Sequence, residues 1–301
     1  MNPFTTNRQD VLMKSQQKYP KTFSFEFFPP RTDKGVESLR AQREQLARLH
    51  PRFFSVTFGA GGSTQERTLE TVLEIQRESG IEAAPHLSCI GSSREKIQQI
   101  LKTYQDAGIR HIVALRGDLP SGVREPGEFH YANELVRFIR EVSGDHFHIE
   151  VAAYPEFHPQ ALNAFDDLKH FRNKVEAGAN SAITQYFYNP DSYFSFVDSC
   201  EKLGVDIPIV PGIMPITNYV QLARFSDACG AEIPRWIRKR LEAYGDDLTS
   251  IRQFGIEVVT RLCERLLAEG APGLHFYTMN KAEPTLTIWN NLGLGDLSES
   301  P

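Results

Sequence analysis

Residues 22–30 read Thr22-Phe23-Ser24-Phe25-Glu26-Phe27-Phe28-Pro29-Pro30, which predicts a β-strand ended by two prolines. The alternation puts three phenylalanines on one face of the strand and Ser24, Glu26 and Phe28 on the other. An ionised carboxylate is costly to bury among aromatic rings, so we expect either a raised pKa for Glu26 or a partner beside it. An edge strand would leave Glu26 in solvent, whereas a dry cleft would make it a general acid.

Outward from this strand, β-rich runs alternate with amphipathic helical segments. The predicted strands cover 22–28, 53–58, 82–88, 111–116, 148–154, 181–187, 208–213 and 273–279. Helical periodicity between them covers 36–50, 65–79, 94–107, 132–142 and 161–177. Ser93 and Asn189-Pro190 mark helix starts, and several helices end at glycine. Eight strand–helix units in 301 residues predict an α/β fold, a (β/α)8 TIM barrel.

A doubly wound open sheet is the alternative fold. It usually carries a Gly-rich phosphate loop after its first strand, where this chain has Pro29-Pro30-Arg31. The glycine-rich run 59–64 lacks the third small residue of a dinucleotide fingerprint, so we interpret it as a βα loop. Residues 233–249 predict an extra helical segment before the last strand. Since no linker divides the chain, we expect a polar N-terminal arm at 1–21 and a single catalytic domain at 22–301.

The composition argues against several classes of function. A net charge of −5 gives no reason to expect nucleic acid or an anionic membrane as partner. The polar start lacks the pattern of a signal peptide, and no run approaches the roughly 18 apolar residues that cross a bilayer. Four widely spaced cysteines favour isolated thiols in a reduced cytoplasm over a zinc site. His146 and His148 alternate on a strand, but no carboxylate or cysteine obviously completes a metal site, and none is predicted.

Polar side chains gather late in the predicted strands, where the active site of a barrel forms. In strand order they are Glu26, Thr57, His86, Arg116, Asp118, Tyr154, Gln185 and Tyr277. Each of these residues could instead have a purely structural role. For example, His86 could be a core histidine, and Arg116-Gly117-Asp118 a salt-bridged turn. The shared location is therefore the informative feature. Because the chain contains no HExxH, P-loop or Ser-His-Asp pattern, such a site suits an organic cofactor that carries the reaction itself.

Several blocks, in order along the chain, resemble bacterial members of the methylenetetrahydrofolate reductase family. They are SFEFFPPR at 24–31, SVTFGA at 55–60, AAPHL at 83–87, HIVALRGD at 111–118, AAYPE at 152–156, GAN at 178–180, ITQ at 183–185, PGI at 211–213 and HFYT at 275–278. The likeness runs from residue 22 to 290. It implies a (β/α)8 barrel that holds FAD.

The resemblance also implies a reaction. FAD would take a hydride from NADH or NADPH and pass it from flavin N5 to methylenetetrahydrofolate, with ping-pong kinetics. Glu26 would be the general acid that opens the five-membered folate ring to an iminium, which the hydride converts to a methyl group for methionine synthesis. Asp118 would lie near the flavin pyrimidine edge, contact the pterin and stabilise the cation. We expect a cytoplasmic homo-oligomer.

Binding residues follow from the same resemblance. The implied flavin contacts are Thr57, His86, Arg116, Gly117, Asp118, Tyr131, Ala132, Tyr154, His158, Asp167 and Lys174. Arg116 and Lys174 suit the diphosphate, because cations pair with phosphate oxygens. The implied substrate contacts are Gln185, Gln221, Phe225, Tyr277 and Lys281.

The chain differs from some family members at two positions, and the sequence leaves two other functions possible. Phe58 stands where some members carry Tyr, and Lys281 where some carry Arg. The chain stops at Pro301 without the regulatory domain of eukaryotic members, so we expect no feedback by S-adenosylmethionine and favour NADH as donor. The other functions are a flavin-free lyase or aldolase that uses Glu26 as base with Lys174 or Lys281 as cation, and a non-catalytic folate-binding or scaffold protein.

Overall fold

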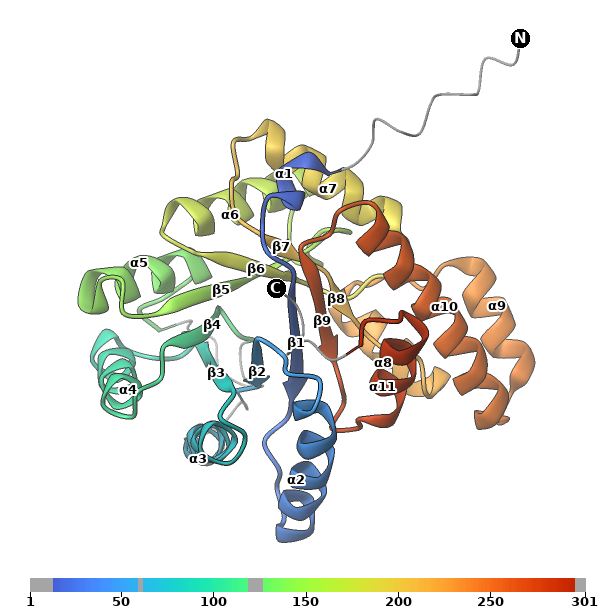
Figure 1. The fold of residues 1–301 in the computed structure, drawn as a ribbon. Helices are drawn as coiled ribbons and strands as arrows, with labels where there is room; N and C mark the ends of the chain where they lie inside the picture. Colours follow the sequence, from blue (N-terminus) through green and yellow to red (C-terminus); the bar gives the residue numbers. More distant parts are fainter. Residues whose placement is uncertain (1–12, 59–61, 119–126, 296–301) are drawn as a thin grey trace.

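The strands form one continuous sheet, and the two strands at its ends follow each other directly in the sequence. A computed structural model describes residues 13–58, 62–118 and 127–295 and contains nine parallel strands in the order β7-β6-β5-β4-β3-β2-β1-β9-β8. Because β7 and β8 are consecutive in the chain, this order closes into a barrel. Figure 1 shows the strands at the centre with the helices around them. The predicted (β/α)8 barrel is confirmed.

The strands begin and end close to the predicted positions. They are β1 (Thr22–Phe27), β2 (Phe53–Val56), β3 (Glu82–Ser88), β4 (His111–Leu115), β5 (His148–Ala153), β6 (Ser181–Thr184), β7 (Ile209–Val210), β8 (Gly212–Ile213) and β9 (Gly273–Tyr277). The predicted seventh strand is divided in two at Pro211, which has no N–H to donate to a neighbour. Its carbonyl accepts from the backbone N–H of His275 at 3.0 Å. The first half of this strand therefore pairs with β6 and the second half with β9.

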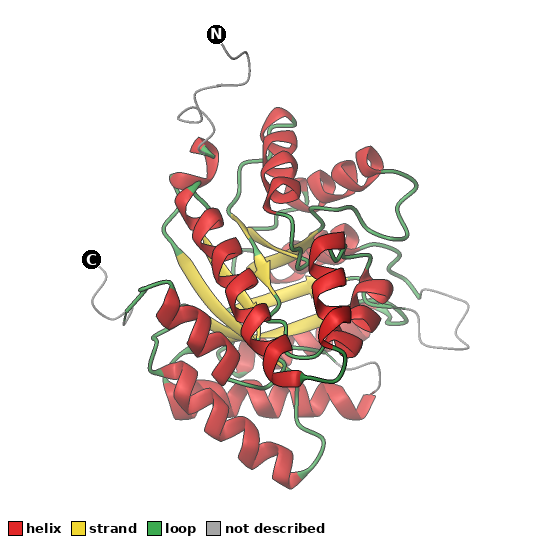
Figure 2. Ribbon diagram, turned by 90° about the vertical axis from the view of Figure 1, so that its right-hand side faces the viewer, coloured by secondary structure: helices red, strands yellow, loops and turns green. Residues whose placement is uncertain are grey.

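The helices alternate with the strands and cover the outside of the sheet, as Figure 2 shows. They are α1 (Lys14–Gln17), α2 (Asp33–Ala47), α3 (Gly62–Ser79), α4 (Arg94–Asp106), α5 (Ala132–Ser143), α6 (Ala164–Glu176), α7 (Pro190–Lys202), α8 (Tyr219–Cys229), α9 (Arg235–Tyr244), α10 (Leu248–Ala268) and α11 (Glu283–Asn291). Ser93 and Asn189 cap α4 and α7, as predicted. The extra helical segment before the last strand is confirmed as α9. Residues 59–61 of the predicted βα loop lie outside the described residues.

The described part of the N-terminal arm packs against the barrel. Gln16 in α1 is buried, its amide nitrogen donates to the carbonyl of Ile207 at 3.2 Å, and its amide oxygen accepts from the N–H of Ile209 at 2.8 Å. These partners lie where β7 begins, so α1 covers the amino-terminal end of the barrel, next to α7 in Figure 1. Residues 1–12 lie outside the described part of the chain.

The two faces of β1 have the predicted environments. Phe25 and Phe27 pack outward against Phe54, while Phe25 also contacts Phe276 and Trp289. Inside the barrel, a small apolar layer contains Phe53, Ala84, Val113 and Ile183. Polar side chains lie on both sides of this layer. The carboxyl-terminal side holds Glu26, and the amino-terminal side holds a second polar cluster.

Two further sequence expectations concern the cysteines and membrane spans. All four cysteines are unpaired, and Cys89, Cys200 and Cys263 are buried, in agreement with the prediction of isolated thiols. Over the described residues, no helix combines the length and the apolar character that a bilayer crossing needs.

Candidate active site

Glu26 points into the barrel near the carboxyl end of β1 and is 8% exposed. Its Oε2 atom lies 3.3 Å from Nε2 of His86 in β3 and 3.5 Å from Nε2 of His275 in β9. The interpretation of an edge strand with Glu26 in solvent is therefore wrong. The carboxylate is instead shared by two imidazoles from nearby strands of the barrel.

Of the two expectations for Glu26, the structure shows a partner beside the carboxyl and not a raised pKa. Burial alone would raise the pKa of this carboxyl, but His275 and His86 outweigh burial and lower the pKa to about 2. The reason is the identity of the neighbours, which are imidazoles and not only aromatic rings. Glu26 is thus the ionised member of a buried acid–imidazole group.

Ser24 orients one of these imidazoles. Its hydroxyl oxygen lies 2.7 Å from Nδ1 of His275, so the other ring nitrogen faces Glu26. Neither Nε2 of His86 nor Nε2 of His275 has an aligned hydrogen-bond partner, although both are buried. These unsatisfied nitrogens and the nearby carboxylate form a polar group at the barrel mouth that a bound polar molecule can engage.

A second group of predicted residues lies where β4 and β5 end. The Arg116 guanidinium donates to the carbonyl of Gly117 at 3.1 Å and to the side-chain oxygen of Gln160. The backbone N–H of Gln160 in turn donates to Nδ1 of His158 at 3.1 Å, and the N–H of His158 donates to Asp167 at 2.9 Å. The structure therefore joins four of the predicted cofactor contacts through Gln160, a residue that the sequence reasoning missed.

Tyr154 and Lys174 complete this group. The Tyr154 ring meets the His158 ring edge-on at 4.6 Å, and burial raises the pKa of Tyr154 to about 12. Lys174 in α6 donates to the carbonyl of Ala152, and burial lowers the pKa of its ammonium to about 8. A cleft of about 310 Å³ beside them is lined by residues that include Tyr154, Phe165 and Asp167.

The two cations of this group form hydrogen bonds to neutral oxygens. Arg116 and Lys174 donate to carbonyl and amide oxygens, and in the described parts of the chain neither forms an ion pair. Exposed aromatic side chains lie nearby in the sequence: Tyr131 is 52% exposed and stacks on His170, and Phe165 is 58% exposed. Cations and exposed aromatic rings are both side chains that suit an anionic aromatic ligand.

The other predicted residues lie at the ends of other strands and helices. Thr57 follows β2, Ala132 begins α5, and Gln185 follows β6 with its side-chain oxygen accepting from the N–H of Tyr186. The Tyr277 hydroxyl donates across the barrel to the carbonyl of Thr184 at 2.7 Å. Because Tyr277 pairs with Glu26 in the sheet register, it adjoins the acid–imidazole group.

Four predicted residues lie at the surface. Gln221 and Phe225 are exposed one turn apart on α8, as their spacing predicts, and Asp118 and Lys281 are also exposed. No contact joins any of the four to Glu26 among the described residues.

His275 is the main residue that the sequence reasoning missed. It lies two positions before Tyr277 and so faces the barrel interior with it. The same alternation that identified Tyr277 would have found His275. Ser24 was placed on the correct face, but its hydrogen bond depends on pairing between β1 and β9, which come from opposite ends of the chain.

Fold and site together define a (β/α)8-barrel protein with an acid–base group at the carboxyl ends of its strands. Residues 12–293 match the family model described as methylenetetrahydrofolate reductase. The chain is 41% identical to 5,10-methylenetetrahydrofolate reductase of Pectobacterium carotovorum subsp. carotovorum over 98% of both chains. It is 40% identical to the Escherichia coli (strain K12) protein of that name, over 98% of this chain and 99% of the relative. The chain therefore belongs to the methylenetetrahydrofolate reductase family.

A plant protein and a solved structure are also similar to this chain. "Methylenetetrahydrofolate reductase (NADH) 1" of Arabidopsis thaliana is 41% identical over 96% of this chain, which spans 51% of the plant protein. Among solved structures, an uncharacterized protein from Clostridium thermocellum that binds two copies of 5-methyl-5,6,7,8-tetrahydrofolic acid superposes with a TM-score of 0.63 over 94% of this chain and 96% of the other. Their sequence identity is 15%, so this likeness shows the fold alone.

Proposed function

We propose that this protein is an FAD-dependent reductase that converts 5,10-methylenetetrahydrofolate to 5-methyltetrahydrofolate, with NADH favoured over NADPH as donor. The observation that carries the proposal is the buried Glu26 carboxylate between His86 and His275 at the barrel mouth of a family member. The product would supply methyl groups for methionine synthesis. The proposal includes a single catalytic domain, a cytoplasmic location and a homo-oligomeric state.

Glu26 is the proton donor in this proposal. Because the carboxyl is ionised before folate binds, it must take up a proton before it can act. Folate binding excludes water from the carboxyl end of the barrel, and burial without water favours the neutral form of the carboxyl group. The proton on Oε2 then passes to the folate nitrogen and opens the five-membered ring. Ser24 keeps His275 oriented toward Glu26.

The residues where β4 and β5 end fit FAD. Arg116 and Lys174 offer positive charge without an ion-pair partner in the described residues, as an anionic diphosphate requires. The exposed ring of Tyr131 and the rings of Tyr154 and His158 offer apolar surface to flat groups. When bound, FAD would supply hydride transfer between the nicotinamide and the folate. Asp118 would place negative charge near the folate cation, and Gln185 would bind the pterin.

Visible absorbance tests whether the protein binds a flavin. The purified protein should be yellow, should bleach with NADH without oxygen, and should regain its colour on addition of methylenetetrahydrofolate. Stopped-flow absorbance with NADH and with NADPH then measures donor preference. A colourless protein that cannot be reconstituted with FAD would rule out the flavoenzyme.

A lyase or aldolase is the second candidate because of Lys174. Its buried ammonium, with a pKa lowered to about 8, is the kind of lysine that forms Schiff bases. Borohydride trapping with carbonyl substrates separates the two candidates. We expect no covalent mass increase at Lys174, whereas a trapped adduct in a flavin-free protein would favour the lyase.

A further inference from the structure

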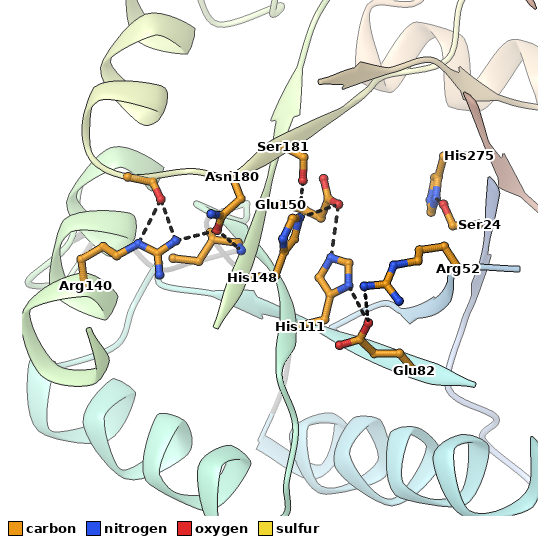
Figure 3. Close-up of polar contacts among 12 residues, drawn as sticks. Ser24, Arg52, Glu82, His111, Arg140, His148, Glu150, Asn180, Ser181 and His275 are labelled. Carbon is orange, nitrogen blue, oxygen red and sulfur yellow. Dashed lines mark hydrogen bonds and ion pairs between the residues drawn. The ribbon is translucent and has the colours of Figure 1, made fainter. Parts of the chain in front are cut away.

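A second polar cluster lies inside the barrel at the end opposite Glu26. His111 begins β4, His148 begins β5, and Glu150 lies two residues further along β5 on the same face as His148. Figure 3 shows the two imidazoles directed toward the Glu150 carboxylate, with Glu82 beyond His111. The mechanism proposed above uses none of these side chains.

The three donor atoms have the spacing of metal ligands. Oε1 of Glu150 lies 3.2 Å from Nε2 of His111 and 3.5 Å from Nε2 of His148. In tetrahedral zinc, with bonds of about 2.0–2.2 Å, neighbouring ligand atoms lie about 3.4 Å apart. All three donor atoms lie within 4.8 Å of one another. The exposed His148 side chain can make the small movement that brings the two imidazole nitrogens closer.

The Glu150 carboxylate is buried with one of its oxygens unsatisfied. Glu150 is 3% exposed, and its second oxygen, Oε2, is buried without a hydrogen-bond partner. A buried carboxylate with an unsatisfied oxygen is a group that a bound cation would satisfy.

A carboxylate lies near the second ring nitrogen of His111. Its Nδ1 lies 3.7 Å from Oε2 of Glu82, which in turn lies 3.8 Å from Nη2 of Arg52. Histidines that bind metal through one nitrogen commonly donate from the other to a carboxylate, which fixes the ring and strengthens the ligand. On the other side, Nε2 of His148 lies 2.6 Å from the Ser181 hydroxyl, which a metal would displace from that lone pair.

The cluster is separate from the Glu26 group. The apolar layer of Phe53, Ala84, Val113 and Ile183 lies between them, and the Phe53 ring packs on His111 at 4.2 Å. Two histidines with one carboxylate leave one position of a tetrahedron open to a water molecule.

We propose that His111, His148 and Glu150 bind one divalent first-row transition-metal ion of the Zn²⁺ type, with water as fourth ligand and Glu82 orienting His111. The ion links β4 to β5 at the amino-terminal end of the barrel. It has a structural role and is independent of the reductase activity. The sequence pattern alone predicts no such site, because His111 lies far from His148 along the chain and Glu150 lies within a strand.

The test uses the full-length, flavin-loaded protein with any purification tag removed, because a polyhistidine tag would bind the same metals. After EDTA treatment and gel filtration, titration with ZnCl₂ in a calorimeter should give one site per chain. Co²⁺ should give the visible absorption of a tetrahedral site. Zn²⁺ should raise Tm by at least about 3 °C.

Three variants locate the site. His148→Ala should weaken Zn²⁺ binding by more than tenfold and abolish the rise in Tm, and it should fold because His148 is exposed. Glu82→Gln should weaken binding about ten- to a hundredfold through His111. His146→Ala is the matched control, since this nearby histidine contacts Arg110 and the carbonyl of Ile109 instead. It should bind Zn²⁺ as the wild type does.

Two results would overturn the proposal. If the wild type takes up no Zn²⁺, the cluster is an ion-pair network in which His111 bridges Glu82 and Glu150. If His148→Ala binds Zn²⁺ as tightly as the wild type, the metal is held elsewhere. Both readouts are independent of catalysis, so loss of reductase activity would not affect this conclusion.

Discussion

A single carboxylate shows how neighbours decide the chemistry of a residue. Glu26 is buried, and burial disfavours the charged form. His86 and His275 reverse that preference because each brings a nitrogen within 3.5 Å of the same oxygen. The carboxyl group is therefore ionised until it takes up a proton. In the proposed reaction, this proton is needed for the folate step and not for flavin reduction.

Glu26→Gln should retain flavin reduction and lose folate reduction. The amide cannot transfer a proton, so the folate half-reaction should slow by about 10²–10⁴-fold, the usual contribution of a general acid. Stopped-flow absorbance measures both half-reactions in the same sample, and the NADH step serves as the internal control. An equal loss in both steps would mean that Glu26 only maintains structure or binds the cofactor.

Lys174 should make FAD binding weaken at alkaline pH. Its pKa is lowered to about 8 by burial, so the ammonium is charged below pH 8 and loses its proton above that value. If the charge holds the diphosphate, FAD affinity should be constant up to about pH 7 and fall up to tenfold per pH unit above 8.

Fluorescence titration of apoprotein with FAD measures this dependence. Lys174→Met should weaken FAD binding about tenfold at pH 7 and remove the alkaline decline, because a hydrogen bond from a charged group contributes about 1.5–3 kcal/mol. Lys202→Met is the control, since Lys202 is exposed on α7 and paired with Asp198. Retention of the decline in Lys174→Met would assign it to another group.

Among the elements, the junction after β4 depends on one glycine. Gly117 has φ of +83°, and a Cβ atom there would lie 1.9 Å from the hydroxyl oxygen of Ser88. That hydroxyl donates to the carbonyl of Arg116 at 2.8 Å and so connects the end of β3 to the end of β4. A side chain at position 117 would thus disturb the segment that positions the Arg116 guanidinium.

Gly117→Ala should lower the free energy of unfolding by about 2–4 kcal/mol, through backbone strain together with displacement of Ser88. Gly108→Ala is the matched control: Gly108 has φ of +74°, but a Cβ atom at this position would meet nothing within 4 Å, so only about 1 kcal/mol of strain is expected. Urea unfolding compares the two variants. Equal losses would show that the Ser88 contact contributes nothing.

At the scale of the whole molecule, the barrel is closed at its amino-terminal end by a short helix. The buried Gln16 side chain of α1 makes two hydrogen bonds to the segment that enters β7. The N–H of Met13 also donates to the carbonyl of Glu269 at 3.0 Å, after α10. The beginning of the described chain therefore contacts segments that precede β7 and β9.

Gln16→Ala should destabilise the protein by about 2 kcal/mol, because the carbonyl of Ile207 and the N–H of Ile209 lose their partners in a buried place. The urea midpoint should fall with little change in slope. Gln17→Ala is the control, since Gln17 is exposed on the same helix, and its effect should stay within about 0.5 kcal/mol. A midpoint unchanged in Gln16→Ala would show that α1 does not stabilise the barrel.

The strands and helices were predictable from the sequence, because they follow from short-range alternation and capping. Glu26, His86 and Tyr277 were also found from the sequence, since each comes late in a predicted strand, where the active site of a barrel forms. Only the tertiary structure decided the ionisation of Glu26, the break of the seventh strand at Pro211, and the meeting of His111 with His148 and Glu150. Each depends on strand pairing between distant segments, and the charge that a buried group carries is decided by the partners that this pairing supplies.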